Sequence, residues 1–156
     1  MIKIIGLTDI ATLKKEASSA KRLRSHLNLH KTLDAPVQRL FIATNPDTYM
    51  RPHRHPEDHK WEFLIVLEGQ LDLLIFNDDG VVTQRVELAA TKNRAVEIPP
   101  MTWHAYVCKV PGTLALEIKE GAYIPTTEEN FAPWSPAENT SESAKYLSWM
   151  KEAKVV

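Results

Sequence analysis

Residues 53–62 read HRHPEDHKWE, and this segment decides how the rest of the chain is interpreted. Pro56 biases His55 away from helical backbone, and Pro52 acts in the same way on the residue before it. In an extended chain alternate side chains point to the same face, so His53 and His55 would present their imidazoles side by side, about 7 Å apart at Cα. Two imidazoles at that spacing can share one metal ion. The segment therefore predicts half of a metal site.

Two further residues complete the predicted site. Glu62 lies in the apolar run WEFLIVLEG, where a carboxylate is costly to bury without a cation. His104 follows a proline turn in IPPMTWHAYVC. Three neutral imidazoles and one carboxylate around a divalent ion leave about one positive charge and open coordination positions, which suits a catalytic site better than a closed structural one. The predicted ligands of one divalent transition-metal ion (Zn, Fe, Mn or Ni) are His53, His55, Glu62 and His104. The alternative is that these are ordinary surface or hydrogen-bonded core residues.

The centre of the chain is built from short runs rich in β-branched and aromatic residues, separated by turn signals such as NDDG at 77–80. Runs this short and this evenly spaced predict a mainly β fold, a small antiparallel sandwich or barrel. Nothing alternates strand and helix, so a nucleotide-binding α/β fold is not expected. The predicted strands are 37–44, 61–69, 70–76, 81–88, 95–98, 103–108 and 114–119.

Helical patterns frame this β region. A helix is predicted from Thr8 to about Leu23, and a second from about Ser141 to Glu152. The stretch SHLNLHKTLDAP, residues 25–36, lacks a clean period and is interpreted as a connecting arm with a short turn. We expect one structural domain with three regions: the helix and arm (1–36), a barrel (37–121) and a C-terminal extension with its helix (122–156). The predicted apolar stripe of the first helix is Ile10, Leu13, Ala17 and Ala20, and that of the second is Tyr146, Trp149 and Met150.

The irregular stretch after Gly121 contains Tyr123, Phe131 and Trp134. Aromatic side chains bury large apolar areas, so these three are expected to anchor the stretch to the barrel. Trp134 lies among prolines, and we interpret it as a structural anchor rather than a platform for a sugar ring.

Composition narrows the function classes. The chain has 156 residues, with 19 Lys plus Arg against 20 Asp plus Glu, a balance that argues against nucleic-acid or polybasic membrane partners. Cys108 is the only cysteine, which excludes an intramolecular disulfide framework and a thiolate-rich zinc site. No stretch approaches the roughly 20 apolar residues that span a bilayer. A cytoplasmic location is therefore expected.

Together these segments resemble the two motifs of the cupin superfamily, in which a glycine, two histidines, a glutamate and a second glycine are followed by a proline, glycine and histidine motif. Gly69 follows Glu62 at the spacing that the superfamily uses. The resemblance implies a single-domain cupin, a double-stranded β-helix of jelly-roll type with short terminal helices. His59 falls in the shorter glutamate spacing typical of the superfamily and competes with Glu62 as a ligand. The spacing to Gly69 favours Glu62, so we expect His59 at the mouth of the site.

The chain departs from the superfamily pattern at four positions. Asp47 and Asn93 replace the opening glycines, which is tolerable because both residue types can adopt left-handed backbone conformations. Met101 stands where a turn glycine is usual and Cys108 where an asparagine is usual. These departures concern turn geometry rather than the ligands.

Beyond the superfamily, the stretches LRSHLNLH, PVQRLFIA, YMRPHRHPEDHKWEFLIVLEG, VEIPPMTWH, EIKEGAY and FAPWSP resemble the WbuC-type cupin-fold metalloproteins over nearly the whole chain. The resemblance implies a bound metal, and some members of that family occur among genes for surface polysaccharide synthesis. It carries no reaction that can be transferred to this chain.

The candidate catalytic residues are those with titratable side chains that can reach a metal-bound ligand: Tyr106, Glu117, Lys119 and His59. Glu117 and Lys119 alternate with two apolar residues in the last predicted strand, so one pair faces the interior. A charged pair more often faces solvent, and in the interior it would be an acid and base couple. Tyr49 and Tyr106 share the side of their segments that bears the histidines, where each lines the cavity or belongs to the core. Cys108 has the same parity as His104 and is expected to be an inert buried thiol.

His26, Asn28 and His30 lie in the predicted arm. They either fold over the barrel mouth as a lid or belong to a capped surface turn, and the surface turn is the favoured interpretation.

The preferred function is a metal-dependent enzyme acting on a small polar or anionic metabolite, such as a sugar derivative in polysaccharide synthesis. The reaction would be an isomerase or epimerase-like proton transfer, or an oxygenase reaction if the metal is iron. The alternative is a metal-dependent module that binds or senses a sugar or acid without turning it over. A homodimer formed through edge strands is plausible.

Overall fold

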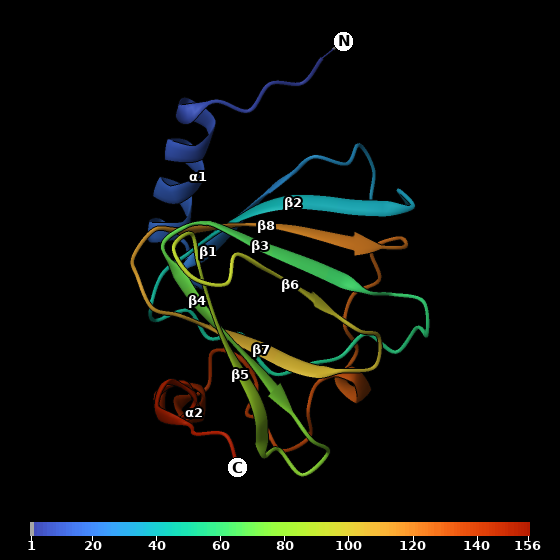
Figure 1. Ribbon diagram of the computed structural model, residues 1–156, viewed down its shortest axis with the longest axis vertical. Helices are drawn as coiled ribbons and strands as arrows, with labels where there is room; N and C mark the ends of the chain where they lie inside the picture. Colours follow the sequence, from blue (N-terminus) through green and yellow to red (C-terminus); the bar gives the residue numbers. More distant parts are fainter. Residues whose placement is uncertain (1) are drawn as a thin grey trace.

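The computed structural model describes residues 2–156 and consists of two antiparallel sheets with a helix near each end of the chain (Figure 1). The strand runs, the turns between them and the final helix follow the sequence pattern closely. The elements are α1 (Leu7–Ser19), β1 (Arg24–Asn28), β2 (Val37–Thr44), β3 (Glu62–Glu68), β4 (Gln70–Phe76), β5 (Val82–Ala89), β6 (Ala95–Ile98), β7 (Trp103–Cys108), β8 (Thr113–Glu120), the 3-10 turn η1 (Glu128–Asn130) and α2 (Ser141–Glu152).

The larger sheet has the strand order β1-β2-β8-β3-β6, and the smaller has the order β5-β4-β7. Each predicted run became a strand, with successive side chains on opposite faces of its sheet. Hydrogen bonding does not join the two sheets into a closed barrel within the described residues. The fold is a single-domain, mainly β sandwich, as predicted. Within residues 2–156 no helix is long and apolar enough to cross a membrane.

The core lies between the sheets and on the outside of the smaller one. One cluster of buried residues contains Leu64, Val66, Leu73, Leu88 and Tyr106 and fills the interior. A second cluster contains Leu74, Phe76 and Trp103 and packs under α2 through Leu147 and Met150. Burying a Leu or Phe side chain stabilises the fold by about 1.5–3 kcal/mol, so these clusters hold both sheets in place without help from a metal.

The N-terminal region differs from the prediction in two ways. The first helix ends at Ser19 rather than Leu23, because Ala20 is already extended and Leu23 has a left-handed φ of 54°. The predicted connecting arm begins with a strand: β1 pairs antiparallel with β2 along its whole length. The arm interpretation was wrong because the side of β1 that turns inward carries Arg24, His26 and Asn28 instead of apolar residues.

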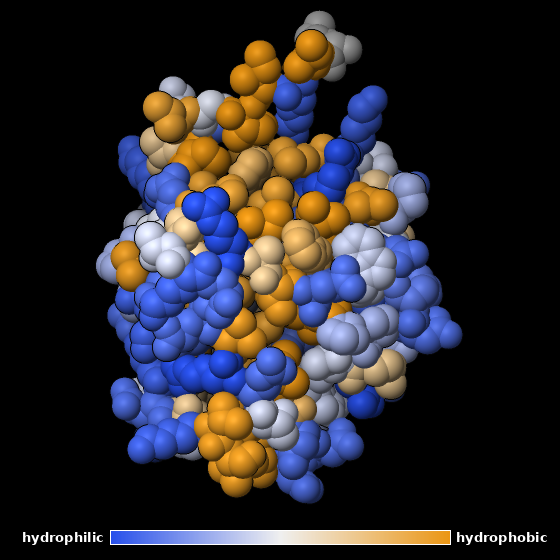
Figure 2. All heavy atoms as spheres, in the orientation of Figure 1, coloured by the Kyte–Doolittle hydropathy of each residue, from blue (hydrophilic) through white to orange (hydrophobic). Residues whose placement is uncertain are grey.

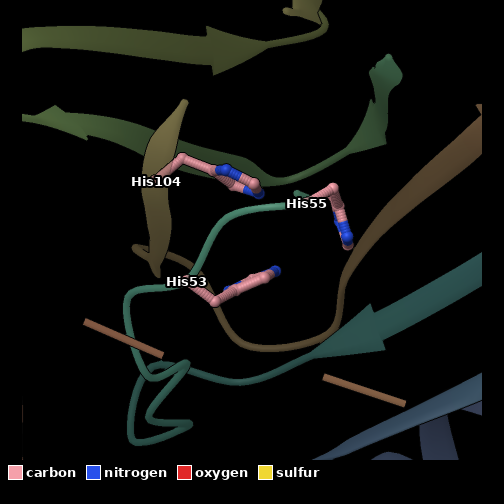
Figure 3. A group of neighbouring side chains, drawn as sticks. All are labelled: His53, His55 and His104. Atoms are coloured by element: carbon pink, nitrogen blue, oxygen red, sulfur yellow. The ribbon is translucent and has the colours of Figure 1, made fainter. Parts of the chain in front are cut away.

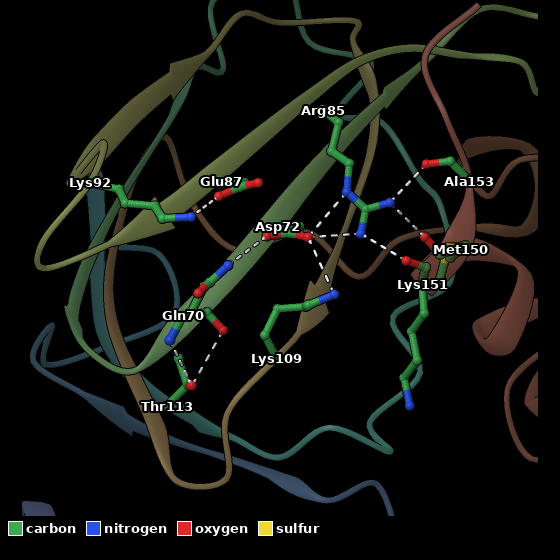
Figure 4. A network of polar contacts seen from close by, with 10 residues as sticks. All are labelled: Gln70, Asp72, Arg85, Glu87, Lys92, Lys109, Thr113, Met150, Lys151 and Ala153. Carbon is green, nitrogen blue, oxygen red and sulfur yellow. Dashed lines mark hydrogen bonds and ion pairs between the residues drawn. The ribbon is translucent and has the colours of Figure 1, made fainter.

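Arg85 on β5 fastens α2 to the smaller sheet (Figure 4). Its guanidinium donates to the carbonyl oxygens of Met150, Lys151 and Ala153 at 2.8–3.2 Å, at the C-terminal end of α2. These carbonyls have no hydrogen-bond partner within the helix, and a cation at a helix C-terminus also interacts favourably with the helix dipole. Asp72 accepts two hydrogen bonds from the same guanidinium, at 2.7 and 3.1 Å, and holds it in position.

The C-terminal extension is anchored by two of its three predicted aromatics. Trp134 packs against Phe76 and Trp103, with ring centroids 5.0 and 6.3 Å away, and donates its indole N–H to the carbonyl of Asp78 at 3.1 Å. Phe131 lies beside His53. The ring of Tyr123 does not serve as an anchor, because the residue is 51% exposed. Its amide instead donates to the carbonyl of Leu33 in the arm, at 2.7 Å.

Candidate metal centre

His53 and His104 are placed against each other by backbone pairing. The amide of His53 donates to the carbonyl of His104 at 3.0 Å, and the amide of His104 donates back at 2.9 Å. His104 lies on β7, whereas His53 belongs to the extended segment that Pro52 and Pro56 favour. Their ring centroids lie 4.5 Å apart. Two distant stretches of chain thus meet at one point.

The C-terminal extension supports the histidine segment from the other side. Residue His53 forms an antiparallel bridge with Phe131 as well as with His104. The amide of Arg54 donates to the carbonyl of Asn130 at 3.0 Å, and the amide of Ala132 donates to that of Pro52 at 2.9 Å. The segment carrying His53 is therefore held between β7 and residues 130–132.

The three imidazoles of His53, His55 and His104 converge, with one ring nitrogen of each within 4.8 Å of the others (Figure 3). Nδ1 of His53 lies 3.0 Å from the carbonyl of Arg51, and Nδ1 of His104 lies 2.9 Å from that of Thr102. A proton on each Nδ1 leaves the Nε2 lone pair free, the arrangement that metal-binding histidines adopt. Nearby backbone carbonyls thus orient two of the three rings so that each Nε2 can coordinate a metal.

Glu62 lies beside this triad at the start of β3 and is buried. Its Oε2 is 3.1 Å from Nε2 of His55 and 3.5 Å from Nε2 of His104. It contacts two of the histidines but does not belong to the group of mutually close ligand atoms. Burial raises the pKa of the Glu62 carboxyl, but Lys119 and the two histidines outweigh that effect and hold the pKa well below its usual range.

The donor set fits a divalent transition metal. Nε2 of His104 is buried, and its contact with Oε2 of Glu62, at 3.5 Å, is too long for a good hydrogen bond, so this nitrogen lacks a close partner. Burial and the neighbouring His104 hold the pKa of His53 well below its usual value, so His53 is a neutral imidazole with an available lone pair. Burial lowers the pKa of His104, but the Glu62 carboxylate has the larger, opposite effect, so the pKa lies above its usual value. Without a metal ion the carboxylate therefore stabilises the imidazolium form. A metal ion would take the place of that proton.

His53 is the member of the triad that lines a cavity of about 350 Å³ on the inner face of the larger sheet. His53 and Glu62 line it from the metal side, and Glu117 and Lys119 line it from β8. The charged pair of β8 therefore faces the interior, not solvent. The register explains this orientation, since Lys119 is the β8 neighbour of Glu62 and the two lie on the same side of the sheet.

The buried Glu117 and the partly buried Lys119 form an ion pair, with Nζ of Lys119 2.6 Å from Oε1 of Glu117. Burial and the nearby Glu62 carboxylate raise the pKa of Glu117 to about 7, despite the opposing effect of Lys119. Burial lowers the pKa of Lys119, but Glu117 and Glu62 outweigh it and raise the pKa above its usual value. A carboxyl that titrates near neutral pH can both accept and donate a proton.

The remaining candidates are placed differently. His59 is on the surface, with its side chain 58% exposed beside Asp58, and it does not line the cavity. Tyr106 is a core residue whose hydroxyl is buried without a hydrogen bond. Tyr49 also belongs to the core and donates to the carbonyl of Pro136 at 2.9 Å. Cys108 points inward, and burial raises the pKa of its thiol.

Side chains of β1 and the arm form the far wall of the cavity. His26, Asn28 and His30 all line it, so they form neither a lid nor a surface turn. Sequence reasoning missed Arg24 and Arg51, which also line the cavity and are buried. Arg24 pairs with Glu138 at 2.6 Å and Arg51 with Glu128 at 2.9 Å. The sequence signal that could have revealed this wall is the polar residue at every second position from Arg24 to Asn28.

The backbone conformations at the turn positions of the superfamily motifs agree only in part with the sequence-based expectations. Gly69 has a φ of 78° between β3 and β4, as a turn glycine requires. Met101 has a φ of 61°, so it adopts the left-handed conformation expected of the glycine that it replaces. Asp47 and Asn93 do not have positive φ, so the suggestion that they use left-handed backbone was wrong.

The fold and the histidine cluster together define a cupin-fold protein with a candidate metal centre. Among solved structures the chain is similar to TT1209 from Thermus thermophilus (15% identity, TM-score 0.55, covering 77% of this chain and 98% of that one). It is similar to the cupin domain of an XRE family transcriptional regulator from Enterobacter cloacae (17%, 0.50, 64% and 98%). It is also similar to the capsular polysaccharide assembling protein CapF from Staphylococcus aureus (18%, 0.55, 68% of this chain and 28% of that one).

Residues 5–88 match the family described as a domain of unknown function, DUF6016, and the chain belongs to that family. No curated protein matches the sequence. The matched region contains His53, His55 and Glu62 and ends before His104. The family description names no activity.

Proposed function

We propose that this protein is a metal-dependent enzyme that catalyses proton transfer on a small polar or anionic metabolite. The observation that carries the proposal is that the candidate ligands His53 and Glu62 line the same cavity of about 350 Å³ as Glu117 and Lys119. The other two histidines lie directly behind this wall, in contact with Glu62. His53, His55 and His104 would hold the ion, with Glu62 as the fourth ligand. A divalent ion bound there polarises an oxygen of the substrate or acidifies a bound water.

The protein's own groups supply the proton transfer. Glu117 is the proposed acid and base, because its carboxyl is buried, faces the cavity and has a pKa of about 7. Lys119 lies between Glu117 and Glu62 and stabilises the charged form of both. Tyr106 has a buried hydroxyl without a partner and is the proposed additional donor. His59 is too exposed to take this role unless its loop closes over the cavity.

The proposed substrate is a sugar derivative, and the proposed subfamily is the WbuC type. The support is the motif resemblance, together with the likeness in fold to CapF, whose name connects it with capsular polysaccharide assembly. Four cationic side chains line the cavity: Arg22, Arg24, Arg51 and Lys119. Each pairs with a carboxylate of the protein, so an anionic substituent such as a carboxylate or phosphate would bind by taking the place of one of these carboxylates. If the native ion is iron, the same ligand set supports an oxygenase reaction instead.

The test has two stages. Elemental analysis of protein purified without added metal identifies the ion. The metal-loaded protein is then incubated in D₂O with sugar phosphates, nucleotide sugars and uronic acids, and deuterium incorporation is followed by NMR and mass spectrometry. We expect exchange at a carbon next to a carbonyl, lowered about 10²–10⁴-fold in Glu117→Gln with the metal retained. Metal-free protein from several expression conditions, or full exchange in Glu117→Gln, would contradict the proposal.

One observation favours the alternative, a binding module without turnover. Glu117 already has an ion-pair partner 2.6 Å away, and a carboxylate so engaged is a poorer base. In that case the substrate panel shows metal-dependent binding and no exchange in the wild-type protein.

A further inference from the structure

The outer face of the larger sheet carries apolar side chains instead of the polar ones expected of a solvated surface. On β3 and β8 the outward positions alternate with the inward-facing Glu62, Glu117 and Lys119. Because side chains alternate between the two faces of a sheet, the polar residues that line the cavity on the inner face leave the apolar residues on the outer face. The outward apolar residues are half-buried or exposed: Val37, Trp61, Phe63, Ile65, Leu116 and Ile118.

Helix α1 covers only one end of this face. Its buried residues Leu13 and Ala17 pack on Ala43 and Leu114, with Phe41 at the margin. The rest of the face has no covering element among residues 2–156. Figure 2 shows hydrophobic residues gathered across the part of the molecule where β2, β8 and β3 run, with hydrophilic residues on both sides. A contiguous apolar patch of this kind marks an interaction surface.

The strand register gives the patch a charge pattern. One row across four neighbouring strands reads Arg39, Ile118, Phe63 and Glu97. Arg39 and Glu97 are both exposed, and neither side chain forms an ion pair or a hydrogen bond within residues 2–156. The row therefore has an unpaired cation at one end, an unpaired anion at the other and two apolar residues between them.

Such a row is complementary to a copy of itself. A two-fold axis that runs along the strands between β8 and β3 reverses the row, so Arg39 of one copy faces Glu97 of the second and Ile118 faces Phe63. The adjacent row reads Phe41, Leu116, Ile65 and Ala95. The same rotation sets Leu116 against Ile65, and the large Phe41 against the small Ala95. Self-complementary contacts of this kind are what a two-fold dimer requires.

We infer that this chain forms a homodimer through the outer faces of its two larger sheets, with an Arg39–Glu97 ion pair on each side of the axis. The dimer leaves the cavity free, because the cavity lies on the inner face of the same sheet. It involves face-to-face packing and not the edge strands. The inference does not depend on the proposed metal or on any activity.

Sedimentation equilibrium over a range of protein concentrations tests the inference. We expect the wild-type protein to sediment at twice the 17.7 kDa mass of the chain. Ile118→Asp places a charge at the centre of the contact and should yield monomer. Val81→Asp is the matched control: Val81 is 37% exposed on a hairpin of the smaller sheet, and its substitution should leave the dimer intact. Circular dichroism verifies that each variant is folded.

Charge reversal tests the geometry more strictly. Arg39→Glu and Glu97→Arg each place like charges opposite one another and should raise the dimer dissociation constant about tenfold or more. The double variant R39E/E97R restores opposite charges and should recover most of the wild-type affinity. A wild-type monomer at every concentration, a dimer unaffected by Ile118→Asp, or a double variant no tighter than the single ones would overturn the inference.

Discussion

The backbones of His53 and His104 are joined by a reciprocal pair of hydrogen bonds, 3.0 and 2.9 Å long. The two imidazoles therefore lie side by side because their main chains are paired, and this pairing does not depend on an ion. Both residues belong to a fold whose clusters of buried residues lie elsewhere. The candidate centre is thus preorganised by the backbone, and we expect the stability of the fold not to depend on a bound ion.

The first prediction is that His53→Ala and His104→Ala abolish metal retention and leave a folded, β-rich protein. Each variant removes one of three converging nitrogens but none of the backbone bonds that pair the two segments. Elemental analysis and circular dichroism are the measurements. His59→Ala is the control, because His59 is exposed and lies apart from the triad, and it should retain the metal. Unfolding that accompanies metal loss would show that the ion is structural.

The second prediction concerns the link between Arg85 and α2 (Figure 4). Arg85→Ala leaves the buried Asp72 carboxylate without its main partner and frees three carbonyls at the end of α2. Breaking a buried pair from one side is costly, and we expect a loss of about 3 kcal/mol in the free energy of unfolding, measured by urea denaturation. Lys92→Ala removes the exposed pair with Glu87 and should cause no measurable change. Equal effects of the two substitutions would contradict the proposed link.

The third prediction concerns Gly69. A Cβ at this position would clash with Oγ1 of Thr113 and lie 2.9 Å from its Cα, and the φ of 78° disfavours any other residue. Thr113 cannot move aside, because its hydroxyl bonds to Val110 and Gln70. We expect Gly69→Ala to lower the free energy of unfolding by about 2 kcal/mol or more, of which the positive φ alone accounts for about 1–2 kcal/mol.

Gly112→Ala separates the two effects in the Gly69 experiment. Gly112 has a φ of 68°, but the nearest atom to its added Cβ is the flexible end of Lys14 at 3.8 Å. We expect only the conformational cost, about 1 kcal/mol. Chemical denaturation of both variants gives the comparison, and a Gly112 variant as unstable as the Gly69 variant would remove the steric argument.

The fourth prediction concerns pH and Cys108. Burial raises the pKa of this thiol, although its hydrogen bonds act in the opposite direction. The thiolate is the reactive form, so the folded protein should react with a disulfide reagent far more slowly than urea-unfolded protein at pH 8. Above about pH 8.5 the unfolded thiol ionises before the folded one, so this group lowers stability as the pH rises. Equal rates for folded and unfolded protein would show that Cys108 is accessible.

The strands were predictable where both faces of a strand followed the usual pattern. β4, β6 and β7 carry apolar residues toward a dry interior, and their predicted limits agree with the structure. Pattern reasoning failed where the interior is a polar cavity. On β1 the inward side chains are Arg24, His26 and Asn28, so the inward apolar residues that usually reveal a strand were absent.

The same inversion explains the orientation of β8. A solvated outer face was the more frequent expectation for Glu117 and Lys119, and yet they face inward while Leu116 and Ile118 face outward. The candidate ligands could be found because their spacing depends on local backbone, which the prolines constrain. Arg51 and Glu138 could not be assigned to the cavity in this way, since only tertiary packing brings them to it.

Residues 130–132 hold the segment that carries His53 against β7. A chain shortened to end at Gly121 would still contain all four predicted ligands, and an inventory of donor atoms would count it as complete. It would nevertheless lack the brace behind the first histidine. A shortened chain of this kind is therefore expected to capture metal less well, although no residue of the missing tail is a candidate ligand.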